Sequence, residues 1–183
     1  MSDHRGEIVI IDDAELVVRV LRKALEGQGW NVRSANSGAA GVAEVRRQRP
    51  DVVISDLHMP DMNGHQVIEA LHRSDRQLPV ILLSSDAELS AVLGAVRRGA
   101  FDYVLKSDLG NLSAAVERAH AYSKQASGGP SGDLEPALDA LRLRLVELEN
   151  AALRSQDGDM LRRFDAVKTA AAAVASAGGQ TWD

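Results

Sequence analysis

Five short apolar runs alternate with five segments of helical periodicity, and this alternation most constrains the fold. The strand-like runs lie at residues 7–11, 30–35, 52–55, 80–84 and 103–105, and the helical segments at 15–25, 38–47, 66–72, 89–97 and 112–123. Neighbouring parallel strands need a crossover connection, which a helix provides with a right-handed turn. Runs such as Val52-Val53-Ile54 are apolar at every position, which is typical of strands buried on both faces. The sequence therefore predicts an α/β fold with a doubly wound, five-stranded parallel sheet.

Spacing within the helical segments predicts which side chains face the sheet. Leu16, Val20 and Leu21 recur at helical spacing in the first segment, and Val42 and Val45 do so in the second. This spacing predicts a helix in each segment, and we expect Val42 and Val45 to face inward.

A second region follows the alternating part. Residues 127–133 are rich in Gly and Ser, which predicts a flexible linker. Beyond it, apolar residues recur at spacings of three and four in two stripes separated by a short polar turn: Leu134, Leu138, Leu141, Leu145, Leu148 and Ala152, then Met160, Phe164, Val167, Ala171 and Val174. This pattern predicts an α-helical hairpin or coiled coil over residues 134–183 that serves dimerisation or partner binding, because short helices need a packing partner.

Polar residues stand where four of the predicted strands end. Asp12 and Asp13 follow the first strand, Asp56 the third, Ser84 ends the fourth and Lys106 follows the fifth. In parallel sheets of this kind the working site lies beyond the carboxyl ends of the strands. The sequence therefore predicts that three carboxylates, a hydroxyl and a lysine meet at one edge.

Such a cluster suits phosphoryl chemistry. Neighbouring carboxylates repel one another and raise their proton affinity unless a cation neutralises them, and Mg²⁺ prefers such hard oxygen ligands. A carboxylate can accept a phosphoryl group while Lys106 and Ser84 contact its oxygens. Each residue alone has a simpler interpretation as a turn, a loop residue or a solvated side chain. Their coincidence at successive strand ends favours a functional site.

Over residues 6–124 these motifs resemble the receiver domain of two-component response regulators. The resemblance implies a flavodoxin-like sheet of order 2-1-3-4-5 in a domain spanning residues 1–126. It also implies that Asp12 and Asp13 place Mg²⁺, and that Asp56 accepts a phosphoryl group from a sensor histidine kinase or a phosphotransfer protein. In the segment 56–64, which looks like the family's loop, the main-chain carbonyl of His58 would be a further metal ligand, and Lys106 would contact the phosphate.

The same resemblance implies a conformational switch. Ser84 and Tyr103 stand at the positions where the family pairs a hydroxyl with an aromatic ring, so phosphorylation would draw Ser84 inward and let Tyr103 rotate behind it. Tyr103 could equally be a plain core residue. One departure concerns Lys106, which is followed by Ser107 where the family usually has a proline in a cis bond, so the geometry of that loop is open.

Composition excludes several other classes of function. The chain has no cysteine, its net charge is −5, and acidic residues outnumber basic ones both before and after residue 127. A thiolate metal site or a cysteine nucleophile is thereby excluded, and direct binding to nucleic acid is disfavoured. The lack of a long apolar run or a secretory signal predicts a cytoplasmic protein without membrane insertion.

These expectations combine into a two-component response regulator that is not a separate enzyme and that controls a helical, non-DNA-binding output. All five histidines precede residue 127, so the tail cannot relay phosphate through a histidine. A homodimer could form through the tail or through the face of the fourth and fifth helices, with an unknown downstream protein. Two alternatives stay open: the input half of a longer signalling kinase or cyclase, and a single-domain phosphate shuttle or sink.

Overall fold

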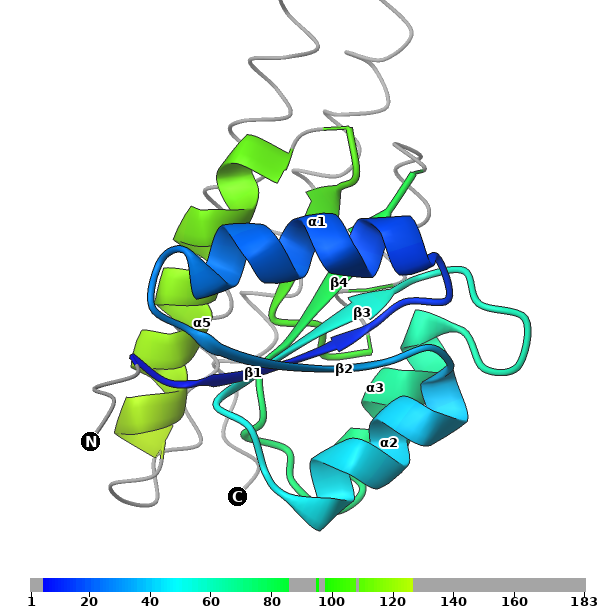
Figure 1. Cartoon of the computed structure of the whole chain (residues 1–183). Helices are drawn as coiled ribbons and strands as arrows, with labels where there is room; N and C mark the ends of the chain where they lie inside the picture. Colours follow the sequence, from blue (N-terminus) through cyan, green and yellow to red (C-terminus); the bar gives the residue numbers. More distant parts are fainter. Residues whose placement is uncertain (1–4, 86–94, 96–97, 108, 127–183) are drawn as a thin grey trace, which may run out of the picture. The chain divides into compact units, whose positions relative to one another are not determined.

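A parallel five-stranded sheet forms the centre of the described part of the chain (Figure 1). The computed structural model describes residues 5–85, 95, 98–107 and 109–126. Its strands are β1 (Glu7–Ile11), β2 (Asn31–Ala35), β3 (Val52–Asp56), β4 (Val80–Ser84) and β5 (Asp102–Leu105). They lie in the order β2-β1-β3-β4-β5, and every neighbouring pair is parallel. The predicted fold class and strand order are confirmed.

Four of the five predicted helices lie among the described residues, each at its predicted place. The described helices are α1 (Glu15–Glu26), α2 (Gly38–Arg47), α3 (Gly64–His72) and α5 (Leu112–Ala126), the last preceded by a 3-10 turn, η1 (Leu109–Asn111). The predicted helix at 89–97, the linker at 127–133 and the helical tail at 134–183 lie outside the described residues. Among the helices of the described part, none combines the length and the apolar character that crossing a membrane requires.

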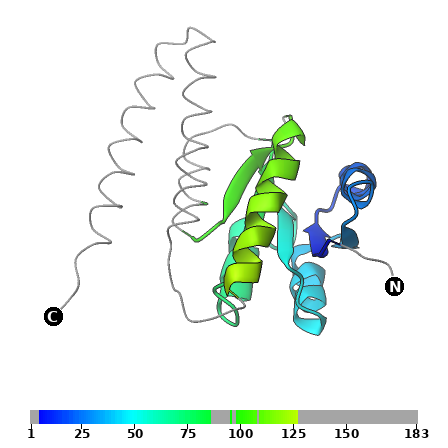
Figure 2. The same ribbon diagram turned by 90° about the vertical axis from the view of Figure 1, so that its left-hand side faces the viewer.

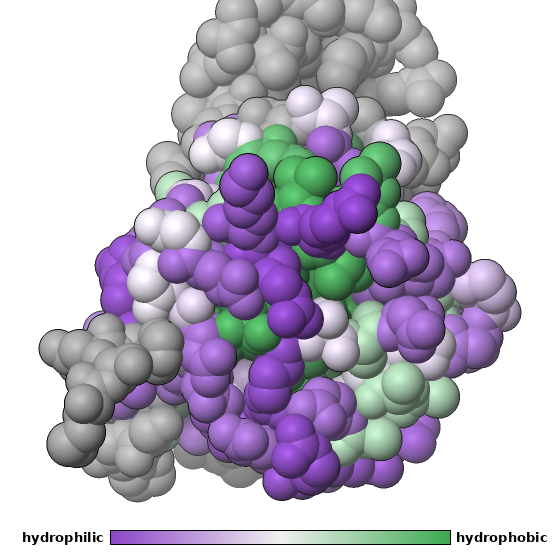
Figure 3. Space-filling model, viewed as in Figure 1, coloured by the Kyte–Doolittle hydropathy of each residue, from purple (hydrophilic) through white to green (hydrophobic). Residues whose placement is uncertain are grey.

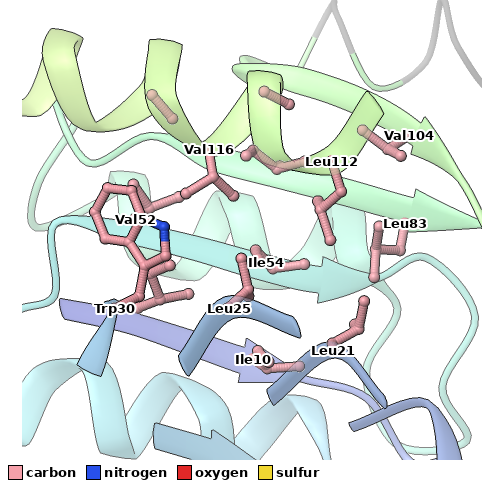
Figure 4. Packing of buried hydrophobic residues seen from close by; sticks show 14 of the residues in the cluster. Ile10, Leu21, Leu25, Trp30, Val52, Ile54, Leu83, Val104, Leu112 and Val116 are labelled. Atoms are coloured by element: carbon pink, nitrogen blue, oxygen red, sulfur yellow. The ribbon is translucent and has the colours of Figure 1, made fainter. Parts of the chain in front are cut away.

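The helices cover the sheet on both faces. One apolar cluster joins α1 and α5 to the sheet, and Figure 4 shows Leu21 and Leu25 of α1 packed near Ile54 of β3, with Leu112 and Val116 of α5 alongside. A second cluster joins α2 and α3 to the opposite face. Figure 2 views the same arrangement with α5 nearest the reader. Burial on both faces explains why the central strands are apolar at every position.

The inward placement of Val42 and Val45 on α2 is confirmed, since both are buried. On α1, Leu21 and Leu25 are buried, whereas Leu16 is 62% exposed and Val20 49% exposed. With 3.6 residues per turn, the side packed on the sheet carries Leu21, Leu25 and the partly buried Val17, and leaves Leu16 and Val20 turned away. Apolar side chains consequently reach the surface along α1 (Figure 3).

Candidate functional site

The register of the sheet brings the predicted site residues to one edge. Ile11 pairs with Ser55, so Asp12 and Asp56 follow at the same level of adjacent strands. Ser84 pairs with Leu105, so Lys106 continues directly beside it, and the Lys106 amide donates to the Ser84 carbonyl at 2.7 Å. The carboxyl ends of β1, β3, β4 and β5 therefore all contribute to one site.

Three carboxylates converge there. Each of Asp12, Asp13 and Asp56 offers an oxygen, and these ligand atoms all lie within 4.8 Å of one another. Asp12 is fully buried and Asp56 is 5% exposed, whereas Asp13 faces solvent. Asp12 also has a local contact, since its Oδ1 accepts a hydrogen bond from the Ala14 amide at 2.9 Å. This bond fixes the Asp12 carboxylate at the start of α1.

Lys106 reaches into the carboxylate cluster from the end of β5. Its Nζ lies 2.8 Å from Asp12 Oδ2 and 3.1 Å from Asp56 Oδ2, and only 17% of its side chain is exposed. Burial lowers the pKa of Lys106, but the hydrogen bonds to Asp12 and Asp56 outweigh this, and the net pKa is raised. Lys106 is therefore a fixed positive charge that bridges two of the three carboxylates.

Burial controls the acidity of Asp56. The pKa of Asp56 is raised above its ordinary value chiefly because the carboxyl is buried, while the hydrogen bond and charge of Lys106 act in the opposite direction. The negative charge of Asp12 raises it further, by less than Lys106 lowers it. Repulsion among the carboxylates, which the sequence led us to expect as the cause, is thus a smaller contribution than loss of water.

The loop after β3 places its backbone beside Asp56. The Leu57 amide donates to the Leu83 carbonyl at 2.8 Å, and the Gly64 amide closes the loop by donating to the Leu57 carbonyl at 3.0 Å. The His58 amide hydrogen-bonds to the Asp56 carboxylate and lowers its pKa, while the His58 side chain is exposed. A Cβ on Gly64 would lie 2.6 Å from the Asp56 carbonyl oxygen, so this close approach requires glycine.

The two predicted switch residues are both buried. Ser84 is fully buried at the end of β4, and Tyr103 is 6% exposed within the cluster that joins α2 and α3 to the sheet. The Tyr103 amide donates to Asp102 Oδ1 at 2.7 Å. This placement agrees with both interpretations of Tyr103, as switch and as core. The described peptide bonds are all trans, including that between Lys106 and Ser107.

The cluster fits Mg²⁺ by the chemistry of its donors. Three carboxylates face one lysine ammonium, so negative charge remains after the Lys106 ion pairs are counted. Mg²⁺ takes one or two carboxylates together with waters and phosphate oxygens, and the exposed Asp13 leaves such a site open to solvent. The carbonyl of His58 belongs to the loop beside this opening.

Two carboxylates escaped the sequence reasoning. Asp61 accepts hydrogen bonds from the Gly38 and Ala39 amides at the start of α2. Asp102, buried at the start of β5, forms an ion pair with Arg118 of α5, whose Nη2 donates to Asp102 Oδ2 at 2.6 Å. Neither has a local sequence signal, because both partners come from distant parts of the chain.

Comparison with known proteins identifies the family of this fold. Residues 8–117 match the family described as the response regulator receiver domain. The chain is 38% identical over 115 residues to the regulatory protein AtoC of Escherichia coli, 33% identical over 122 residues to the DNA-binding transcriptional regulator NtrC of the same species, and 35% identical over 99 residues to the probable transcriptional regulatory protein TcrX of Mycobacterium tuberculosis. These matches cover 62%, 66% and 54% of the chain, but only 25%, 26% and 42% of the respective relatives.

Solved structures share the fold. A response regulator receiver domain protein from Clostridium thermocellum superposes with a TM-score of 0.63 at 27% identity, covering 66% of this chain and 98% of that one. The chemotaxis protein CheY4 of Vibrio cholerae gives a TM-score of 0.59 at 22% identity, covering 62% and 98%, which supports the fold alone. The sheet order, the acidic edge and the family match over more than half the chain lead to one conclusion: this protein belongs to the response regulator receiver domain family.

Proposed function

We propose that this chain is a phosphorylation-controlled switch in which Asp56 accepts a phosphoryl group from a sensor histidine kinase or a phosphotransfer protein. The observation that carries the proposal is the convergence of Asp12, Asp13 and Asp56 within 4.8 Å, with the Lys106 ammonium in ion-pair contact with two of them. A carboxylate nucleophile, a cation site and a fixed positive charge are the parts that transfer to an aspartate requires.

In the proposed transfer, an Asp56 carboxylate oxygen forms a bond to phosphorus while the bond from phosphorus to the donor's histidine nitrogen breaks. The electron pair of that bond stays with the leaving imidazole. Lys106 supplies positive charge to the incoming phosphoryl oxygens, and Ser84 lies at the neighbouring strand end to donate a hydrogen bond. A Mg²⁺ ion held by Asp12, Asp13, Asp56 and the His58 carbonyl would offset the remaining negative charge.

The test is labelling by a small phosphodonor, acetyl phosphate, in the presence of Mg²⁺. Wild type should gain one phosphoryl group by mass spectrometry, and Asp56→Asn should gain none. Asp51→Asn is the matched control, because Asp51 stands just before the same strand at the opposite edge, where it accepts a bond from the Glu7 amide. Asp51→Asn should be labelled like wild type. Undiminished labelling of Asp56→Asn would refute the assignment.

For the output, we propose that the helical tail dimerises or binds a partner in response to phosphorylation of Asp56, with repacking at Ser84 and Tyr103 as the link. The heptad stripes in the sequence support this, and the acidic charge of the tail supports an output that does not contact DNA. AtoC and NtrC are far longer than this chain, and NtrC is a DNA-binding regulator, so the absence of nucleic-acid binding remains a prediction. The cytoplasmic location is likewise a prediction.

A further inference from the structure

Asp61 joins the loop after Asp56 to the start of α2. Its two carboxylate oxygens each accept a backbone hydrogen bond, Oδ1 from the Gly38 amide at 3.1 Å and Oδ2 from the Ala39 amide at 3.0 Å. The contact spans 22 and 23 positions of sequence. It therefore connects two separate crossovers of the fold.

A carboxylate suits this position. The first amides of a helix lack partners within the helix, and the aligned peptide dipoles make that end positive. Ser37 Oγ accepts from the Ala40 amide, which leaves the Gly38 and Ala39 amides to Asp61, and the first turn of α2 contains no acidic residue of its own. The Ala39 amide, together with that of Gly38, holds the pKa of Asp61 below its ordinary value.

The two segments are also pressed together sterically. A Cβ placed on Gly38 would lie 2.6 Å from the Met62 Cβ and 2.8 Å from the Met62 carbonyl oxygen. A Cβ atom does not approach other heavy atoms this closely, so a glycine is needed for the loop backbone to lie directly on the start of α2. The Asp61 contact is thus part of a closely fitted joint.

The loop held by this joint carries the backbone that meets the acceptor. Its beginning is fixed by Leu57, whose amide bonds to β4, and its end by Asn63, which caps α3 through reciprocal bonds with Gln66. Between these ends lies His58, whose amide bonds to the Asp56 carboxylate and whose carbonyl is the expected metal ligand. Asp61 supplies a polar anchor for this middle part.

We propose that Asp61 is a positioning residue that clamps the loop of residues 57–63 to the start of α2 and thereby fixes the His58 carbonyl for Mg²⁺. The proposal rests on the function proposed above. It adds a residue whose effect on the metal passes through the loop backbone, because the hydrogen bonds that the Asp61 carboxylate accepts within the described part come from amides of α2 and of its own loop.

The experiment is a Mg²⁺ titration of the full chain, without phosphodonor, followed by NMR on the amide signals of the folded protein. Asp61→Ala should raise the Mg²⁺ dissociation constant on the order of tenfold, the lower end of what loss of an outer partner costs a metal site. Asp61→Asn keeps one acceptor oxygen and should give an intermediate value. The Gly38 and Ala39 amide signals should shift in both variants and exchange faster with solvent in Asp61→Ala.

The matched control is Asp75→Ala. Asp75 is also a loop carboxylate with two contacts, a bond from the Gln77 amide and an ion pair with Arg49, but it lies outside the site. Because distant sites act independently, its Mg²⁺ dissociation constant should stay within about twofold of wild type. Equal Mg²⁺ affinity in wild type and Asp61→Ala would overturn the clamp while leaving the acceptor role of Asp56 intact. Failure of wild type to bind Mg²⁺ would overturn both.

Discussion

Lys106 occupies a place where its charge competes with that of a metal ion. Its ammonium balances the same two carboxylates, Asp12 at 2.8 Å and Asp56 at 3.1 Å, that a Mg²⁺ ion would use. Two cations that share ligands repel each other, so the Lys106 ammonium does not add to the affinity for a metal ion, and the role proposed for it is contact with the phosphoryl group. Asp13 differs from Lys106 because it is a negatively charged and exposed member of the cluster, and could therefore serve as a ligand of the metal ion.

This contrast gives a prediction for two single variants. Asp13→Ala should lose most of its Mg²⁺ affinity, whereas Lys106→Met should bind Mg²⁺ at least as tightly as wild type. Phosphorylation of Lys106→Met by acetyl phosphate should nevertheless slow by tenfold or more, about 1.4 kcal/mol in the barrier. Calorimetric titration with Mg²⁺ and the rate of labelling measure the two quantities separately. Equal losses of metal affinity in both variants would contradict this division of roles.

Among the helices, α2 is tied to the rest of the fold by charge as well as by apolar contacts. Glu44 on α2 accepts hydrogen bonds from Arg47 one turn later and from Arg33 of β2. The Arg47 bond, followed by that of Arg33, lowers the pKa of Glu44 from 4.5 to about 2, although burial acts in the other direction. The Glu44 carboxylate therefore stays charged at pH values at which a glutamate is ordinarily protonated.

The lowered pKa predicts how stability depends on pH. Because the folded pKa of about 2 lies below the unfolded value of 4.5, the stabilisation from Glu44 is complete above 4.5 and is lost as the pH falls toward 2. Glu44→Gln should therefore be less stable than wild type at pH 6, and the difference should shrink by pH 3. Urea unfolding at the two pH values measures it.

A second background tests the cause. In a chain that carries Arg33→Gln and Arg47→Gln, Glu44 has lost both partners, so Glu44→Gln should have a much smaller effect that changes little with pH. A pH dependence of the same size in both backgrounds would show that these arginines are not responsible.

Local features could be predicted from the sequence, whereas contacts between distant segments could not. The strands and the positions of Asp12, Asp56 and Lys106 at their ends follow from local apolar patterns, because a buried parallel strand is apolar throughout and its end fixes the residue after it. The side of α1 that packs on the sheet depends on how the whole helix docks, and the helical spacing of Leu16 and Val20, which are exposed, could not show which side that is. The bond from Asp61 to α2 joins distant segments, so no periodicity could reveal it.

At the level of the whole molecule, the buried apolar clusters of the described part lie between Ile8 and Ala119. Apolar clusters lie on both faces of the sheet, and α5, which ends at Ala126, completes the cluster shared with α1. We therefore predict that a fragment of residues 1–126 unfolds cooperatively in urea, binds Mg²⁺ as tightly as the full chain and is labelled at Asp56 at the same rate. Loss of cooperative unfolding in the fragment would mean that the core requires residues beyond 126.

Comparison of this fragment with the full chain also tests the role of the tail. If the two stripes, from Leu134 to Ala152 and from Met160 to Val174, form helices as the sequence predicts, their apolar faces need packing partners, and a second copy provides one with the same spacing. If phosphorylation promotes this pairing, sedimentation should show a larger dimer fraction for the full chain with Mg²⁺ and beryllium fluoride, a mimic of the acyl phosphate, than without them. The 1–126 fragment should sediment as a monomer in both conditions.

Two other outcomes would change this interpretation of the tail. A fragment that dimerises like the full chain would move the interface to the receiver domain. A full chain that stays monomeric in both conditions would exclude a dimeric output and leave the binding of a different protein as the role of the tail.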